Sequence, residues 1–92
     1  MASGPKPQYL LRLDELTDGY SVVLYGNKKW GATKTTFTGG RSTKFYAEAL
    51  DGSDFISLNL YRTRNGPKLK PCEMPAEKVI DFLKNYICFD QP

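Results

Sequence analysis

A hairpin pattern over residues 55–71 constrains the fold of this chain more than any other part of its sequence. Phe55 to Arg64 is dense in residues that favour strands. Asn65-Gly66 follows, a dipeptide typical of a type I′ turn, because both central residues of that turn need a positive φ. Pro67 to Pro71 then forms a short return strand, and because proline cannot donate to a ladder, we expect this strand at a sheet edge.

The predicted hairpin has two unlike faces. A turn at Asn65-Gly66 sets Arg64 opposite Pro67 and Tyr61 opposite Lys70. One face is apolar and can receive a helix, and Arg62 and Arg64 continue its row towards the tip: Ile56, Leu58, Leu60 and Leu69. The other face has no aliphatic residue: Phe55, Ser57, Asn59, Tyr61, Thr63, Lys68 and Lys70. Such a face is either an ordinary solvated surface or the contact area of a polar partner.

The rest of the chain predicts further strands and one helix. Residues 1–8 are rich in Pro and Gly and lack periodicity, which predicts a disordered arm. We expect strands at Tyr9–Asp14 and Tyr20–Tyr25 that pair as a hairpin, followed by an irregular Gly/Thr loop over 27–43 in which Thr33–Thr38 could be a short strand. An alternating strand at Lys44–Leu50 and a turn at 51–54 come next. After the 55–71 hairpin we expect a helix from Pro75 to about Ile87. The stripe formed by Val79, Ile80, Phe82, Leu83, Tyr86 and Ile87 gives that helix one apolar side.

This order of elements predicts an α+β fold. We expect an antiparallel sheet of about four to six strands with one C-terminal amphipathic helix packed on one face. Residues 9–92 form a single domain, because a chain of 92 residues encloses only one core. A homodimer would enlarge the small core, so we expect one.

The composition argues against several classes of protein. The chain has no histidine, which removes the commonest general acid/base and most zinc sites, so we expect a protein that is not an enzyme and needs no metal or other cofactor. We expect no small-molecule substrate. Cys72 and Cys88 lack the spacing of a metal or redox motif and are expected as reduced thiols. No apolar run could span a bilayer or serve as a secretion signal, which predicts no membrane partner and an intracellular location, in the cytoplasm or the nucleoid or nucleus.

Charge is segregated along the chain. Residues 28–70 contain nine basic and three acidic side chains, a net charge of +6, whereas the flanks sum to −3. Aromatic residues, among them Trp30, Tyr46 and Tyr61, lie in the same basic segment. Basic groups that grip phosphates, together with aromatic rings that stack on bases, are what a single-stranded nucleic acid requires.

We therefore expect non-catalytic binding of single-stranded DNA or RNA through a basic-aromatic sheet face. The candidate binding residues are Lys28, Lys29, Trp30, Lys44, Tyr46, Tyr61, Arg62, Arg64, Lys68 and Lys70. Trp30 has a second interpretation, since a lone tryptophan is as often part of a core as a stacking platform. The alternative function is a small protein-interaction module, an inhibitor or adaptor, that uses the same basic face or offers the edge strand Pro67–Pro71.

The second half of the chain resembles a known group of proteins. Residues 44–86 contain the phrases KFYAEAL and FLKNY, which are similar to PUR repeats, and a basic-aromatic hairpin ahead of a helix. This segment resembles the ββββα unit of the PC4, PUR and Whirly group of single-stranded nucleic-acid-binding proteins. The resemblance implies a curved antiparallel sheet, dimerisation or pairing of two units, and strand surfaces that hold the nucleic acid. Glu48, an acidic residue on the proposed binding side, departs from that pattern.

Overall fold

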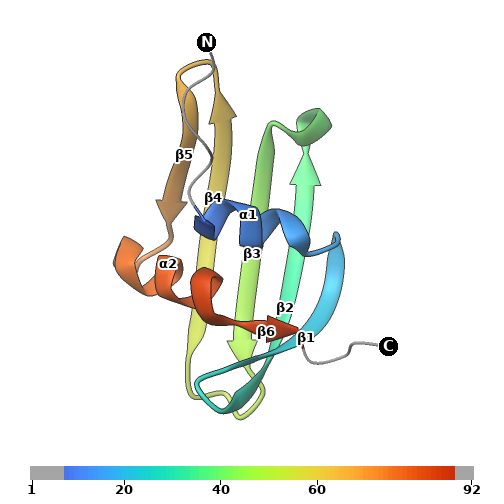
Figure 1. Ribbon diagram of the computed structural model, residues 1–92, viewed down its shortest axis with the longest axis vertical. Helices are drawn as coiled ribbons and strands as arrows, with labels where there is room; N and C mark the ends of the chain where they lie inside the picture. Colours follow the sequence, from blue (N-terminus) through green and yellow to red (C-terminus); the bar gives the residue numbers. More distant parts are fainter. Residues whose placement is uncertain (1–7, 89–92) are drawn as a thin grey trace.

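The computed structural model of the protein describes residues 8–88, which form an open six-stranded antiparallel sheet with two helices on one face (Figure 1). The elements in chain order are α1 (Gln8–Glu15), β1 (Gly19–Tyr25), β2 (Lys28–Phe37), the 3-10 turn η1 (Thr38–Gly40), β3 (Ser42–Ala49), β4 (Phe55–Thr63), β5 (Gly66–Pro71), α2 (Ala76–Asn85) and β6 (Ile87–Cys88). The strand order is β5-β4-β3-β2-β1-β6. The predicted α+β class is confirmed, and β5 lies at an edge as expected.

The first described element is a helix, so the predicted strand at Tyr9–Asp14 is wrong. Leu10 and Leu13, spaced by three residues, are buried on one side of α1, and Arg12 pairs with Glu15 at 2.9 Å one turn later. Leucine and arginine also favour helices more than strands. The expected disordered arm lies mostly in residues 1–7, outside the described residues, and Gln8 already begins α1.

A tight hairpin replaces most of the expected loop over residues 27–43. Gly26 and Asn27 both have positive φ angles, 60° and 64°, and connect Tyr25 directly to its partner Lys28. This is the geometry of a type I′ turn, which right-twisted strands favour. β2 then runs on to Phe37, so only η1 remains of the loop.

The β4–β5 hairpin forms with a turn one residue earlier than predicted. Thr63 pairs with Gly66 and Tyr61 with Lys68, so Arg64 and Asn65 are the central turn residues. Gly66 has a φ of 113° just after the turn, and the Thr63 hydroxyl donates to its carbonyl oxygen at 2.7 Å. Each partner of β4 therefore lies two residues away from its predicted position. A shift of two keeps every side chain on its face, so the predicted apolar and polar faces are confirmed.

The C-terminal helix matches its prediction to within a residue or two at each end. Pro75 has extended dihedral angles and caps α2, which begins at Ala76. Val79, Phe82 and Leu83 are buried against the sheet, as the apolar stripe predicts. Ile87 is the exception, because it leaves the helix for β6 and is exposed.

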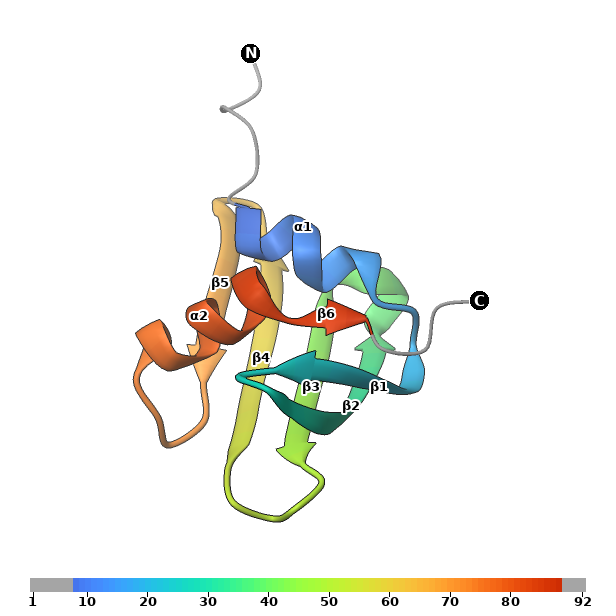
Figure 2. The same ribbon diagram turned by 60° about the horizontal axis from the view of Figure 1, so that its bottom comes forward.

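Both helices cover the same face of the sheet, as Figures 1 and 2 show. Phe82 of α2 is central to the core between the helices and the sheet. The centroid of its ring lies 4.7 Å from that of Tyr25 in β1 and 5.0 Å from that of Trp30 in β2. α1 is joined to α2 and to β2. The Arg12 guanidinium donates to the carbonyl oxygen of Tyr86. The Lys34 ammonium of β2 donates to the carbonyl oxygen of Leu13 at 3.0 Å and to that of Leu16, just after α1, at 2.7 Å.

Two tyrosines of this core should titrate late and make stability pH-dependent. Burial is the largest cause that raises the pKa of both Tyr25 and Tyr86 from 10.0 to about 12, and a hydrogen bond to the Asp81 carboxylate adds to the effect at Tyr25. Because these folded-state values exceed that of the unfolded chain, the stabilisation is complete below pH 10 and is lost as the pH rises towards 12. Tyrosinate absorbance and urea unfolding across this range would measure both effects. A single titration step near pH 10, the pKa of a free phenol, would contradict the expectation.

Candidate nucleic-acid interface

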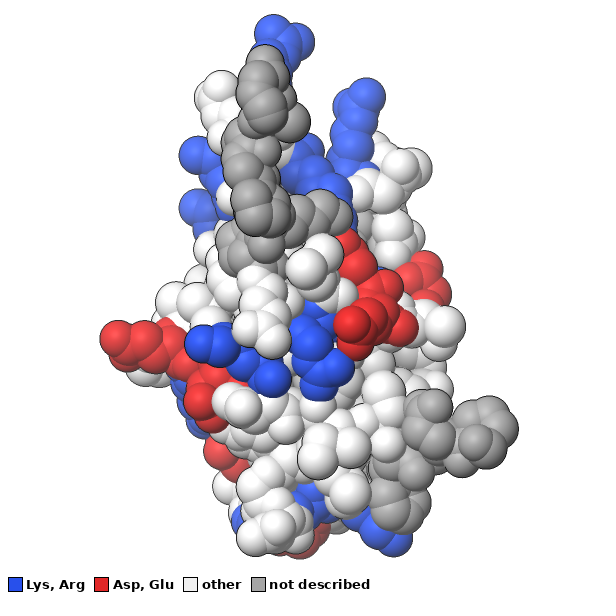
Figure 3. Space-filling view, viewed as in Figure 1, with Lys and Arg blue, Asp and Glu red and all other residues white. Residues whose placement is uncertain are grey.

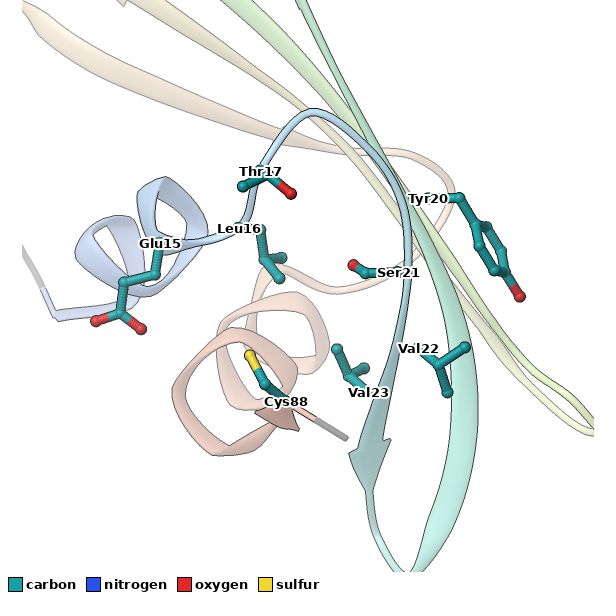
Figure 4. A pocket seen from close by; sticks show the side chains of 8 residues that line it. All are labelled: Glu15, Leu16, Thr17, Tyr20, Ser21, Val22, Val23 and Cys88. Carbon is teal, nitrogen blue, oxygen red and sulfur yellow. The ribbon is translucent and has the colours of Figure 1, made fainter. Parts of the chain in front are cut away.

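The face of the sheet opposite the helices is open and carries five exposed aromatic side chains. By register and burial this open face includes Tyr20, Phe37, Tyr46, Phe55 and Tyr61. Figure 4 shows Tyr20 on the opposite side of β1 from Ser21 and Val23, which point towards the helices. Strand alternation explains this arrangement, since every second residue of each strand turns away from the core.

Basic side chains gather at one end of the open face, near η1 and the β4–β5 turn. Lys68 lies directly across from Tyr61, and in the adjacent row Lys44 and Lys70 flank Asn59. We call this region the basic end. It comprises Phe37, Lys44, Tyr61, Lys68 and Lys70 on the open face, together with Arg64 in the β4–β5 turn that borders it. Its lysines and Arg64 have no carboxylate within ion-pair distance in the part of the chain that the structure describes.

Acidic groups lie away from the basic end. Glu48 is on the open face, four residues along β3 from Lys44, a separation of about 13 Å. On the helix side, Figure 3 shows acidic side chains mainly across the middle of the molecule, whereas basic ones occur at the end where η1 and the β4–β5 turn lie and also in the middle and at the opposite end. A phosphate backbone placed on the basic end would therefore meet little repulsion.

Trp30 is not available for stacking, although the sequence offered it as a candidate. Its side chain is 3% exposed, and its indole N–H donates to the carbonyl oxygen of Tyr25 at 3.0 Å. Trp30 alternates with Lys29 and Gly31 along β2 and turns towards α2, so the interpretation as part of the core is the right one.

Two predicted phosphate-binding residues have structural partners instead. The Arg62 guanidinium pairs with Asp14 at 2.7 Å and donates to the Gly40 carbonyl oxygen and the Thr43 hydroxyl, so it joins α1 to the sheet on the helix side. The Lys28 ammonium donates to Ser53 at 2.6 Å and pairs with Asp51 at 3.3 Å. Neither belongs to the basic end.

Lys29 and Tyr46 lie on the open face but outside the basic end. Lys29 is six residues along β2 from Thr35, the partner of Lys44, which corresponds to about 20 Å. The Tyr46 hydroxyl donates to Glu48 at 3.3 Å, and its ring stacks on Phe55 with the centroids 6.1 Å apart. Burial first, then the charge of Glu48, raises the pKa of Tyr46.

Phe37 is a further candidate site residue, which was not among the predicted binding residues although it lies in the stretch Thr33–Thr38 that could be a short strand. It is 48% exposed and pairs with Ser42, which in turn pairs with Tyr61, so two aromatic rings lie in one row of the basic end. The signal was present in the alternation of Thr33, Thr35 and Phe37 with the inward-facing Ala32 and Lys34.

No protein-family model, curated protein or solved structure matches this chain. Within residues 8–88, Cys72 and Cys88 are free thiols, and no three His, Cys, Asp or Glu side chains come together as metal ligands would. Neither described helix has the length and apolar character to cross a membrane.

Proposed function

We propose that this protein binds single-stranded DNA or RNA at the basic end of its open sheet face, without catalysing a reaction. The observation that carries the proposal is the pairing of Tyr61 with Lys68 beside Lys44 and Lys70. Exposed rings offer stacking surfaces, and Lys68 lies one strand spacing from Tyr61 with Lys44 and Lys70 in the adjacent row. These lysines pair with no carboxylate among residues 8–88. The weak resemblance of residues 44–86 to PC4, PUR and Whirly proteins points the same way.

A single strand fits this surface better than a duplex does. A sheet face of this kind lets splayed bases lie on aromatic rings while the backbone follows the lysines. The major groove of a duplex is usually read by a helix, and α2 exposes Glu77 and Asp81. Because single strands of nucleic acid occur in the cytoplasm and in the nucleoid or nucleus, we propose that the protein acts in one of these locations.

Binding should depend strongly on salt. If Lys44, Arg64, Lys68 and Lys70 each neutralise one phosphate, the logarithm of the affinity should fall against the logarithm of salt with a slope of about −3. Lys70→Gln should make that slope shallower by about 0.7. Fluorescence anisotropy with a labelled single-stranded oligonucleotide at several salt concentrations measures both.

The matched control is Lys84→Gln, which removes the same charge from α2 on the other side of the sheet. It should leave the slope unchanged. An affinity that does not vary with salt, or equal effects of the two variants, would refute the proposal. A duplex of the same length serves as the competitor that should bind less tightly.

The alternative use of β5 as a docking edge for a protein is less well supported. β5 is an edge strand, but Pro67, Lys68, Lys70 and Pro71 along it are residues that hinder pairing with another strand. A homodimer stays part of the proposal, and sedimentation equilibrium with and without the oligonucleotide would test it.

A further inference from the structure

A hollow of about 290 Å³ lies on the open face, outside the basic end; Tyr46, which lines it, is two residues along β3 from Lys44. Tyr20, Thr33 and Tyr46 are neighbours in one row across β1, β2 and β3, so the two tyrosines are separated by the width of one strand. Their backbones are then about 10 Å apart, which leaves space for a flat group between or against the rings. The hollow is smaller than most small-molecule sites, and its size suits a single side chain.

Gly31 allows the hollow to form. A Cβ atom at this position would lie 2.4 Å from the Tyr20 hydroxyl oxygen, so the tyrosine can lie across the sheet only because residue 31 is glycine. Gly31 is not among the residues with a positive φ, and alanine would therefore be compatible with its backbone. Glycine is needed at position 31 because the Tyr20 side chain approaches the backbone closely there, and not because of a turn.

Glu48 gives the hollow a negative charge. It is the cross-strand partner of Gly31, and it lines the hollow with Tyr46, whose hydroxyl donates to its carboxylate at 3.3 Å. Within residues 8–88, no lysine or arginine lies within ion-pair distance of Glu48. The carboxylate would repel a phosphate, so this end of the face requires a different ligand from the basic end.

We propose that this hollow binds the guanidinium group of an arginine presented by a protein partner. Guanidinium is planar and stacks on tyrosine rings, and its paired N–H groups match the two oxygens of a carboxylate. Lysine can provide the charge but neither the flat face nor the paired donors. The inference is independent of nucleic-acid binding, because it uses other residues of the open face.

Capped glycine–X–glycine tripeptides, in which X is arginine, lysine or citrulline, test this inference. Citrulline has nearly the shape of arginine without its charge. Amide chemical shifts of Gly31 and Glu48 in ¹⁵N-labelled protein would report binding. We expect saturable millimolar binding of the arginine peptide, about threefold weaker binding of the lysine peptide and no saturable binding of the citrulline peptide.

Two variants locate the site and one controls for charge. Glu48→Gln should weaken arginine binding about tenfold. Gly31→Ala should weaken it as strongly, because the new methyl group displaces Tyr20. Glu77→Gln removes the same charge from α2 on the other face and should have no effect.

Equal binding of the citrulline and arginine peptides would overturn the inference, as would full affinity in Glu48→Gln. Two further results would assign the hollow to another occupant and also overturn it. One is a single-stranded oligonucleotide that shifts the Gly31 and Glu48 amides more than the arginine peptide does. The other is concentration-dependent self-association that Glu48→Gln abolishes.

Discussion

Replacing Phe82 by alanine should lower the free energy of unfolding by about 3 to 5 kcal/mol. The ring is fully buried and packs against four other aromatic rings, at centroid distances from 4.7 to 6.0 Å: Tyr25, Trp30, Phe45 and Tyr86. Alanine would leave a cavity that these large rings cannot fill without leaving their own contacts. A domain of this size is stable by about 5 to 14 kcal/mol, so much of that stability would be lost.

Phe37→Ala is the matched control for this experiment. It deletes the same atoms from a side chain that is 48% exposed on the open face, and it should cost less than about 1 kcal/mol. Urea unfolding followed by tryptophan fluorescence would compare the two, since Trp30 lies 5.0 Å from Phe82. Equal losses in the two variants would contradict the position of Phe82 at the centre of the core.

Tyr61→Ala should weaken the binding of a single-stranded oligonucleotide by about 1 to 3 kcal/mol, the usual contribution of one stacked base. Tyr61 is 42% exposed and lies directly across from Lys68, so the change removes a ring from the basic end with little loss of packing. Anisotropy titrations give the affinity, and unfolding curves show whether the fold is intact.

The control for Tyr61 is Tyr20→Ala, which removes an exposed tyrosine from β1, three strands and about 14 Å to the side of Tyr61 on the same face. If the basic end is the binding site, this variant should bind the oligonucleotide like the original protein. Equal losses for both tyrosines would mean that the ligand covers the entire face, and no loss for Tyr61 would exclude stacking there.

Strand alternation and the turn at 51–54 were readable from the sequence, but the positions of the two tighter turns, after β1 and after β4, were not. The two faces of β4 and β5 were predicted correctly because side-chain direction depends only on the period of two. The turn was misplaced because Gly66 uses its positive φ after the turn, which the Asn65-Gly66 pair does not reveal. The type I′ turn is formed by Gly26-Asn27, whose sequence is a weaker turn signal. Because this turn was overlooked, most of β2 was predicted as a loop.

The errors at the candidate site come from long-range partners. Sequence shows that Lys28 and Arg62 are basic, but not that Asp51 and Asp14 lie beside them. Lys34 was counted with the basic segment, yet it is almost fully buried and completes the hydrogen bonds at the end of α1. Residues 9–14 were predicted as a strand, and α1 was therefore not expected. Because Lys34 and Arg62 both bind to residues of α1 or just after it, their structural roles could not be predicted.

The contact of α1 with α2 has a consequence for how the chain folds during synthesis. Arg12 and Tyr86 are separated by 74 residues, and the Tyr86 hydroxyl donates to the Arg12 carbonyl oxygen at 2.6 Å. The ribosome releases α1 before the sheet and α2 after β5, so the apolar side of the sheet stays partly uncovered until α2 has been synthesised. Contacts between such distant residues slow folding, and exposed strands in the meantime favour aggregation. A nascent chain that still lacks α2 should therefore aggregate more readily than one that includes it.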